Sequence, residues 1–423
     1  MNQSAPKSVR LQIALFGKVN AGKSSFLNLV ANQDVSITSP IAGTTTDAVE
    51  KAMELLPLGP VLFIDCAGYG DNTVLGAERM KKSDIAYSRA DIIVWVANGA
   101  DFNDVDRTFL KKCTEEKRAV MVVFNKSDIS VPSVEILDEI KAFGIDNILQ
   151  INSLDRKSRE KTVAIFKQAL IKLAPEDFIV NVPLAGDLVP TRSHVVLITP
   201  IDIEAPKGRL IMPQVQTIRD LLDHDCTVSV VKQNDYVNFL ENLKNPPALV
   251  ICDSQVVKKM VAETPADIPC TTFSILFSRL KGDLPLMAKG AMAINSLKDG
   301  DKILIAEGCT HHAVEDDIGR VKIPRMIRQF TGKDLHFEVY AGHDYPENLS
   351  EYALVLHCGG CMLNRRENLS RIELAAHLGV PITNYGMAIS LTQGVLNRVL
   401  SPFLNVVRRE EKNLFICNET VLN

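Results

Sequence analysis

The sequence predicts an α/β protein that contains more than one parallel sheet. Short apolar runs of strand length alternate with longer stretches of helical periodicity from residue 9 onward. The chain has 423 residues, more than one hydrophobic core usually serves, so two or three domains are expected. An apolar fraction of 46% and a charged fraction of 23% are typical of a soluble globular protein.

Charge and composition exclude several classes of protein. The formal net charge is -4, which gives no electrostatic reason to expect nucleic acid or an anionic membrane as the main partner. Residues 1–7 are polar and lack a signal-peptide core, and no apolar run approaches the roughly 18 residues of a membrane helix. We therefore expect a cytoplasmic protein. In that compartment nine cysteines indicate metal binding, redox chemistry or burial rather than disulfides.

The first block is predicted as a domain of residues 1–173. A strand at 9–16 leads through a glycine-rich turn into a helix at 23–31. Further buried strands are expected at 61–65, 92–97 and 119–125. Helical patterns separate these strands, so the block should form a parallel sheet with crossover helices.

The second block is predicted as a small α/β domain of residues 178–265. Its strands are expected at 194–203, 227–231 and 248–252. Its helices are expected at 213–223, 235–243 and 254–262. A sheet of three strands has open edges that something must cover, and a second copy of the chain is one candidate.

The third block is predicted as an α/β domain of residues 266–423. Its strands are expected at 302–306, 336–340 and 353–357, and a long helix at 369–378. This block contains Cys309, Cys358 and Cys361.

A phosphate-binding motif lies in the first block. Residues 17–24 read Gly-Lys-Val-Asn-Ala-Gly-Lys-Ser, which matches G-x-x-x-x-G-K-[ST] between a strand and a helix. The glycines allow backbone N–H groups to surround phosphates at a helix N-terminus. Lys23 should reach the β- and γ-phosphates, and Ser24 should ligate Mg²⁺.

Three further motifs follow in the order that a GTP site requires. Asp-Cys-Ala-Gly at 65–68 places a carboxylate near the metal and the Gly68 N–H near the γ-phosphate. Asn-Lys-Ser-Asp at 125–128 provides Asp128, which can accept from N1–H and the exocyclic amine of guanine but finds no donor on adenine. Gly-Thr-Thr-Thr-Asp at 43–47 should supply a threonine to Mg²⁺. Together the motifs predict a Ras-like P-loop G domain.

These motifs resemble those of the TrmE/Era branch of bacterial GTPases. The resemblance implies Thr45 as the switch threonine, Asn20 as a K⁺ ligand and Ser153 in the last guanine-contacting loop. From the residues alone, Asn20 could equally be a side chain that shapes the loop. Lys23, Thr45 and Gly68 are the expected catalytic residues. The expected nucleotide-binding residues are Gly17, Asn20, Ala21, Gly22, Lys23, Ser24, Ser25, Thr45, Asp65, Gly68, Asn125, Lys126, Asp128 and Ser153.

One position departs from the Ras pattern. Tyr69 follows the Asp-Cys-Ala-Gly motif, where Ras-type enzymes place a glutamine that orients water. Tyrosine cannot act in the same way, so slow intrinsic hydrolysis assisted by a monovalent cation is expected.

A second set of motifs indicates a metal site in the third block. Cys309-Thr310-His311-His312 follows one predicted strand, and His357-Cys358-Gly359-Gly360-Cys361 begins at the carboxyl end of another. The carboxyl ends of parallel strands meet at one sheet edge, where ligands bind. Three thiolates suit either an iron–sulfur cluster or zinc, and a C-x-x-C pair alone could also be a redox pair. The other six cysteines are expected to be packed as small apolar side chains.

The chain combines a G domain with a C-x-H motif and an H-C-x-x-C motif C-terminal to it. This combination resembles the maturation GTPase of the di-iron (FeFe) hydrogenase, the HydF family. The resemblance implies a G domain, a dimerisation domain and a cluster-binding domain, in this order. It implies a [4Fe–4S] cluster on Cys309, Cys358 and Cys361, whose fourth position is open or weakly held by His311, His312 or His357. It also implies a homodimer that receives a di-iron precursor from two radical-enzyme maturases and delivers it to apo-(FeFe)-hydrogenase.

The sequence leaves a second reading open. A zinc-containing GTPase acting in tRNA modification or ribosome assembly would also combine a G domain with cysteines. The acidic balance and the lack of a basic, aromatic-rich stripe favour the first reading, in which GTP or GDP, Mg²⁺, K⁺ and a [4Fe–4S] cluster are the cofactors.

Overall fold

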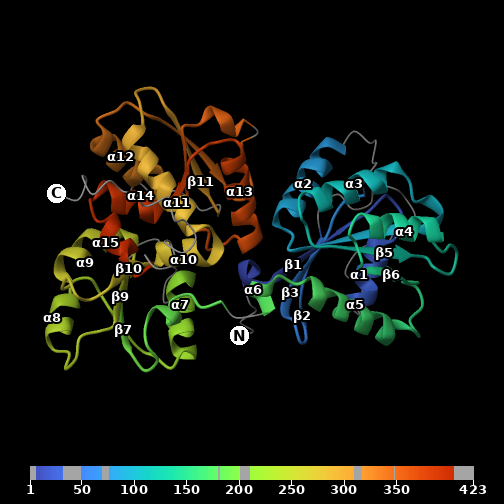
Figure 1. Ribbon diagram of the computed structural model, residues 1–423, viewed down its shortest axis with the longest axis horizontal. Helices are drawn as coiled ribbons and strands as arrows, with labels where there is room; N and C mark the ends of the chain where they lie inside the picture. The colour runs from blue at the N-terminus through green and yellow to red at the C-terminus, as the bar shows by residue number, and fades with distance from the viewer. Residues whose placement is uncertain are drawn as a thin grey trace. The chain divides into compact units, whose positions relative to one another are not determined.

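The computed structural model describes residues 6–31, 49–68, 76–179, 182–200, 210–308, 317–346 and 348–403. The chain divides into two compact units, Met1–Asn181 and Val182–Asn423 (Figure 1). We call them unit 1 and unit 2. The α/β class predicted from the sequence is confirmed, with a six-stranded sheet in the described part of unit 1 and two four-stranded sheets in that of unit 2.

The sheet of unit 1 has the strand order β2-β3-β1-β4-β5-β6. Its strands are β1 (Leu11–Phe16), β2 (Val49–Leu55), β3 (Gly59–Asp65), β4 (Ile92–Asn98), β5 (Val120–Asn125) and β6 (Ile148–Gln150). Neighbouring strands are parallel except for β2, which pairs antiparallel with β3 at the sheet edge. The carboxyl ends of β1, β3 and β5 therefore lead into the three sequence motifs that follow them.

Helices cover both faces of this sheet (Figure 1). They are α1 (Lys23–Ala31), α2 (Gly76–Arg89), α3 (Asp104–Glu115), α4 (Val134–Ala142), α5 (Arg159–Leu173) and the short α6 (Glu176–Ile179). Alternate residues of β1 enter separate cores. Ile13 packs with Phe26 and Phe166 of α1 and α5, whereas Phe16 packs with Phe109 of α3. All six residues of β1 are buried, as expected for a central strand with helices on both sides.

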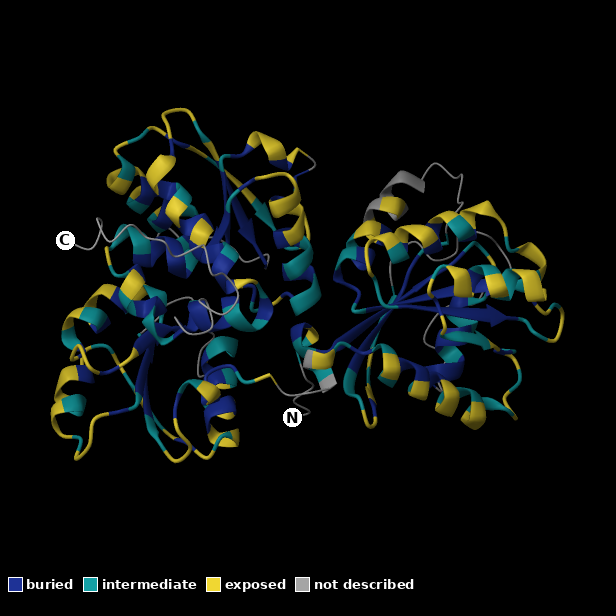
Figure 2. Ribbon diagram, in the orientation of Figure 1, coloured by how far each residue is buried: buried dark blue, intermediate teal, exposed yellow. Residues whose placement is uncertain are grey.

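Unit 2 contains two parallel sheets, with strand orders β10-β9-β7-β8 and β12-β11-β13-β14 among the described residues. The first consists of β7 (His194–Ile198), β8 (Thr227–Val231), β9 (Leu249–Cys252) and β10 (Cys270–Thr272). The second consists of β11 (Lys302–Glu307), β12 (His336–Ala341), β13 (Leu354–His357) and β14 (Ile382–Asn384). In Figure 2 the inner strands of both sheets are buried, and the exposed residues lie mainly on outer helix faces and turns.

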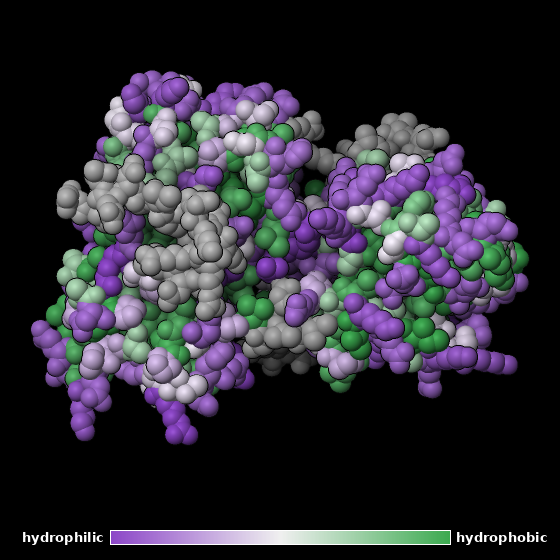
Figure 3. All heavy atoms as spheres, in the orientation of Figure 1, coloured by the Kyte–Doolittle hydropathy of each residue, from purple (hydrophilic) through white to green (hydrophobic). Residues whose placement is uncertain are grey.

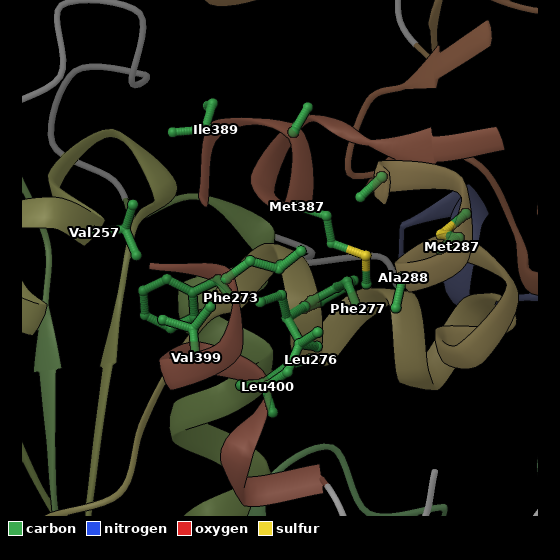
Figure 4. Close-up of a cluster of buried hydrophobic side chains, with 14 of the residues drawn as sticks. Val257, Phe273, Leu276, Phe277, Met287, Ala288, Met387, Ile389, Val399 and Leu400 are labelled. Carbon is green, nitrogen blue, oxygen red and sulfur yellow. The ribbon is translucent and has the colours of Figure 1, made fainter. Parts of the chain in front are cut away.

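The two sheets of unit 2 share one continuous hydrophobic core. The helices of the unit are α7 (Met212–Asp223), α8 (Tyr236–Glu241), α9 (Val257–Glu263), α10 (Phe273–Lys281), α11 (Leu284–Met292), α12 (Ile323–Thr331), α13 (Arg365–His377), α14 (Tyr385–Thr392) and α15 (Leu396–Leu400). Figure 4 shows Phe273 and Phe277 of α10 among Met287, Met387 and Val399 from three other helices. Helix α10 is thus a central packing element between the sheets.

The structure adds strands that the sequence pattern did not indicate. Strands β6, β10 and β14 have three residues each, too few for periodicity to register, and β2 is a half-exposed edge strand with alternating charges. Helix α13 begins at Arg365, four residues before the predicted start, because the Asn364 side chain caps it by accepting from the Glu367 N–H. The predicted three-domain boundaries stay predictions.

Helices that could span a membrane are not found in the described part of the chain. Among the residues described, none of the helices combines the length and apolarity needed to cross a bilayer. Hydrophilic side chains cover much of the face shown in Figure 3, with smaller apolar areas between them.

Candidate functional site

The loop between β1 and α1 can be built only with glycine at two positions. Gly17 has φ +149°, and a Cβ there would lie 2.1 Å from the Val96 carbonyl oxygen. Gly22 has φ +97°, and its Cβ would lie 2.2 Å from Nδ2 of Asn125. The glycines of the P-loop motif therefore let the backbone pass close to β4 and β5. Ala21 and Ser25, at the loop's end and in the first turn of α1, also lie at this site.

Lys23 is buried at the start of α1, with 8% of its surface exposed. Its Nζ donates to the carbonyl oxygens of Gly17 and Lys18, at 3.1 and 3.0 Å. Burial lowers the pKa of Lys23, and the carboxylate of Asp65 opposes that change. The ammonium is therefore held inside the phosphate loop, in the place where the sequence motif requires it.

A hydroxyl and a carboxylate meet next to this lysine. Ser24 Oγ donates to Oδ2 of Asp65, the last residue of β3, at 2.7 Å. Hydroxyl and carboxylate oxygens are the donors that Mg²⁺ prefers, so the pair fits a magnesium site. Gly68 follows, and a Cβ there would lie 2.8 Å from the backbone of Val19, so the 65–68 motif lies against the phosphate loop.

Asn125 connects three of the predicted nucleotide-binding segments. Its Nδ2 donates to the Gly22 carbonyl at 3.2 Å, and its Oδ1 accepts from the Ser153 N–H at 3.0 Å. Lys126 Nζ donates to the Asn20 carbonyl at 2.8 Å. The predicted base-recognition motif at 125–128, the loop at Ser153 and the phosphate loop at 17–24 are thus joined by hydrogen bonds between protein atoms.

The carboxylate that is predicted to recognise the base is accessible. Asp128 is exposed at the end of the Asn-Lys-Ser-Asp motif. Thr45, with the rest of the motif at 43–47, and Tyr69 lie outside the described residues.

The second candidate site is the loop after β13. The Cys358 Sγ accepts the backbone N–H groups of Gly308, at 2.9 Å, and Gly360, at 3.4 Å. Gly360 has φ +60°, and a Cβ there would meet the Asn368 amide at 2.7 Å. Burial raises the pKa of both the Cys358 and the Cys361 thiols. N–H groups directed at sulfur are a feature of thiolate sites that hold iron–sulfur clusters.

His357, which directly precedes Cys358, is buried next to this loop. It is 2% exposed, and its Nδ1 lies 2.8 Å from the Cys358 carbonyl oxygen. Its Nε2 lies 3.4 Å from a guanidinium nitrogen of Arg371. Burial, reinforced by Arg371, lowers the pKa of His357 to about 4. Both ring nitrogens therefore have protein partners in this arrangement.

Two buried cations, which the motif analysis missed, flank the loop. Lys281, the last residue of α10, is 6% exposed and donates to three carbonyl oxygens of the loop. Burial lowers the pKa of Lys281 to about 8, and the neighbouring thiols of Cys361 and Cys358 oppose that change. Arg371, on α13, also contacts the Glu367 carboxylate at 3.2 Å, and Glu367 pairs with His343 at 2.8 Å.

A sequence signal for Lys281 existed. Phe273 and Phe277 precede it at intervals of four in a helix, so the lysine occupies a position where helical periodicity expects an apolar side chain. A charged residue on an apolar stripe is rarely buried without a partner. Arg371 and Glu367 carry the same kind of signal on α13, where both are buried.

The predicted cluster ligands are only partly described. Cys358 and Cys361 are brought together on one loop, whereas Cys309, His311 and His312 lie outside the described residues. Within the described ranges, no group of three metal-binding side chains comes together. The backbone N–H donors, Lys281 and Arg371 nevertheless fit an anionic cluster, because each favours negative charge on the sulfurs of this loop. The other described cysteines are buried, as expected; Cys417 lies outside the described residues.

Three protein-family models match the chain. The 50S ribosome-binding GTPase model matches residues 12–126. The hydrogen maturase F dimerization domain matches residues 184–282, and the hydrogen maturase F tetramerization domain matches residues 285–402. The latter two together cover about half of the chain, and they meet just after α10.

Curated relatives match at the level of the G domain. The tRNA modification GTPase MnmE of Phocaeicola vulgatus is 31% identical over 173 residues, which are 39% of this chain and 33% of that protein. GTPase Der of Kosmotoga olearia is 32% identical over 125 residues, which are 28% of each protein. The chain thus spans about a third or less of the length of these relatives.

Solved structures include a point variant of Aquifex aeolicus Era bound to GDP.AlF4-, with 21% identity and a TM-score of 0.35. That match covers 52% of this chain and 93% of the Era chain. With a GTPase domain followed by both hydrogen maturase F domains, the chain belongs to the hydrogen maturase F (HydF) family.

Proposed function

We propose that this protein is a GTPase and iron–sulfur scaffold that assembles the di-iron subcluster precursor and delivers it to apo-(FeFe)-hydrogenase. The observation that supports this most is the loop at 358–361, whose thiol accepts two backbone N–H groups in a chain with hydrogen maturase F domains. A GTPase domain on the same chain supplies a nucleotide-dependent step.

In the nucleotide site, the backbone N–H groups of residues 17–24 and the Lys23 ammonium would bind the phosphates of GTP. Ser24 and Thr45 would hold Mg²⁺, with Asp65 beside them, and the ion would neutralise charge that develops between the β- and γ-phosphates. Gly68 would donate its N–H to the γ-phosphate. To bind the phosphates, the Lys23 ammonium would give up its hydrogen bonds to two loop carbonyl oxygens. Those two bonds hold the ammonium at the site before GTP binds.

Base selection would depend on Asp128, which is exposed and accessible to the guanine edge. Asn125 and Ser153 would keep the surrounding loops in place through the hydrogen bonds that already join them. Asn20 is the proposed K⁺ ligand. Asn20 is exposed in the phosphate loop, its backbone has φ +62°, and its carbonyl oxygen accepts from Lys126.

In the cluster site, Cys309, Cys358 and Cys361 would hold a [4Fe–4S] cluster, which would supply an iron able to bind a further group. Gly308 is the covalent neighbour of Cys309, and its N–H is directed at the Cys358 sulfur. Gly308, the last described residue before Cys309, therefore lies beside the Cys358 thiol. Three cysteines leave one iron for His311, His312, His357 or an exchangeable ligand.

The partners of this function are apo-(FeFe)-hydrogenase and two radical-enzyme maturases, in the cytoplasm, without nucleic acid or membrane. We propose a homodimer formed through residues 184–282, the range of the dimerization model. Strand β8 is the edge of its sheet among the described strands, and Val230 on it is 43% exposed. An exposed edge of this kind can pair with the same edge of a second copy.

Anaerobic iron, sulfide and zinc analysis with EPR tests this proposal. We expect iron and sulfide in equal amounts, a brown protein and an EPR signal after reduction. A colourless protein that contains zinc and no sulfide would contradict the scaffold and support a zinc-containing GTPase of RNA metabolism.

A further inference from the structure

Lys281 makes three contacts with the cysteine loop and, among the described residues, none with an acid. Its Nζ donates to the carbonyl oxygens of Gly360, Cys361 and Leu363, at 3.3, 3.4 and 2.8 Å. A protonated lysine has three N–H donors, so three acceptors use all of them. In the described part of the chain, no carboxylate lies within ion-pair distance of Lys281.

A buried ammonium without a counter-ion is costly. Carbonyl dipoles offset part of that cost, but they carry no net charge. The ionisable groups that act most strongly on Lys281 are the thiols of Cys361 and Cys358. Ionised sulfurs would supply the negative charge that the ammonium lacks, and cysteine sulfurs are ionised when they bind metal.

Helix α10 fixes Lys281 from the opposite side. Phe273 and Phe277 anchor the helix in the core that the two sheets share (Figure 4). Arg365 donates to the Leu280 carbonyl at 3.0 Å, which adds a second link between the end of α10 and the start of α13. The ammonium thus joins a helix within the dimerization-domain match to a loop within the tetramerization-domain match.

We propose that Lys281 is a positioning residue for the cluster: it holds the loop at 360–363 in the conformation that presents both thiols, and its charge stabilises the reduced cluster. The electrostatic half of this proposal rests on the proposed function. A reduced cluster carries one more negative charge than the oxidised cluster, so a fixed cation nearby raises its reduction potential.

Two variants, Lys281→Met and Lys281→Arg, test the positioning role and the electrostatic role separately. Methionine keeps most of the length and removes charge and donors, whereas arginine keeps the charge. Lys289→Met, on α11, is the matched control because Lys289 is exposed. Circular dichroism and thermal melting establish that each variant is folded, and Lys281→Gln replaces the methionine variant if that variant does not fold.

The first measurement uses metal-free protein. Hydrogen–deuterium exchange of the peptide that contains residues 358–364 should be at least several-fold faster in Lys281→Met than in wild type or Lys289→Met. Lys281→Arg should exchange at an intermediate rate. Unchanged exchange in Lys281→Met would overturn the positioning role, and this result does not depend on whether the protein carries a cluster.

The second measurement is an EPR-monitored redox titration of cluster-loaded protein. Lys281→Met should shift the reduction potential to a more negative value and lose iron to a chelator several-fold faster, and Lys281→Arg should restore the potential. Faster hydrogen–deuterium exchange with an unchanged reduction potential would overturn the electrostatic role. Lys281 would then act only by holding the loop in place. If wild-type protein holds no iron under loading conditions, the proposed function fails, and the exchange measurement alone decides the positioning role.

Discussion

Lys23 in unit 1 and Lys281 in unit 2 are both buried lysines whose ammonium groups donate to main-chain carbonyl oxygens of a neighbouring loop. They differ in what lies beside them. Lys23 has the Asp65 carboxylate as an electrostatic neighbour, and Lys281 has two thiols. Lys23 also lies at a loop whose glycines let the backbone pass close to β4 and β5, whereas Lys281 contacts the backbone of the loop that carries Cys358 and Cys361.

This difference indicates two ways of using a buried cation. At the phosphate loop, we expect the cation to leave the Gly17 and Lys18 carbonyl oxygens and to contact the phosphates directly. At the cysteine loop, we expect the cation to act through the backbone and through its charge, because its hydrogen bonds go to loop carbonyl oxygens. Changes at the first site should therefore abolish a reaction, and changes at the second should alter the stability and potential of a bound group.

The largest expected effect is loss of the cluster from cysteine variants. Cys309→Ser, Cys358→Ser or Cys361→Ser should each remove most of the iron, because serine is a poor ligand for a cluster iron. Iron and sulfide analysis after anaerobic loading measures this. Cys226→Ser is the matched control, since Cys226 is buried in another part of unit 2 and donates to a backbone carbonyl. Full iron content in all three variants would remove the basis for the cysteine site.

Lys23→Ala and Ser24→Ala should reduce GTP hydrolysis by about a hundredfold or more, since each removes a group aimed at the phosphates or at Mg²⁺. Their cluster content should stay at the wild-type level, because the lysine and the cysteine loop belong to separate compact units. Phosphate release and iron analysis on the same preparations measure both. Variants that purify without iron would show that the two sites are not independent.

Asp128→Asn should weaken GTP binding by roughly a hundredfold, or ~3 kcal/mol for two hydrogen bonds to a charged acceptor. Binding of xanthosine nucleotides should strengthen, because their C2 oxygen can accept from the new amide. Titration with GTP, XTP and ATP measures the change. A wild-type protein with equal affinity for ATP and GTP would refute the guanine assignment.

K⁺ should stimulate hydrolysis severalfold over Na⁺, because Tyr69 replaces the glutamine that orients water in Ras-type enzymes. Asn20→Ala should remove the difference between the two ions and leave GTP binding nearly unchanged. Rates in matched concentrations of the two salts test this. Equal wild-type rates in both salts would leave Asn20 as a residue that shapes the loop.

The contrast also explains what the sequence could predict. Residues 17–24, 65–68 and 125–128 are contiguous motifs at strand ends, so the P-loop, Asp65 and Asn125 could be named, and the structure brings them together. Lys281 could not be found in this way, because it contacts the cysteine loop from a helix about 80 residues earlier in the chain. The short strands β6, β10 and β14 were missed for a related reason. These three-residue segments are strands because they pair with a neighbouring strand, and their own sequence pattern is too short to show it.

The smallest expected effect concerns the fourth cluster ligand. Three cysteines leave one iron without a thiolate, and an imidazole there is easier to displace than a thiolate. Single substitutions of His311, His312 or His357 by alanine should therefore retain the iron, and substitution of the residue that ligates should alter the EPR signal or its response to added imidazole or cyanide.

The structure sharpens this prediction for His357. Its ring contacts the Cys358 carbonyl and Arg371, so ligation would require it to leave both partners. We therefore expect the change in the EPR signal to be larger for His311→Ala or His312→Ala than for His357→Ala. If every histidine variant loses its iron as completely as the cysteine variants do, the site has no exchangeable position. A carrier would then have no iron on which to accept and release its cargo, and a structural cluster would be the better account.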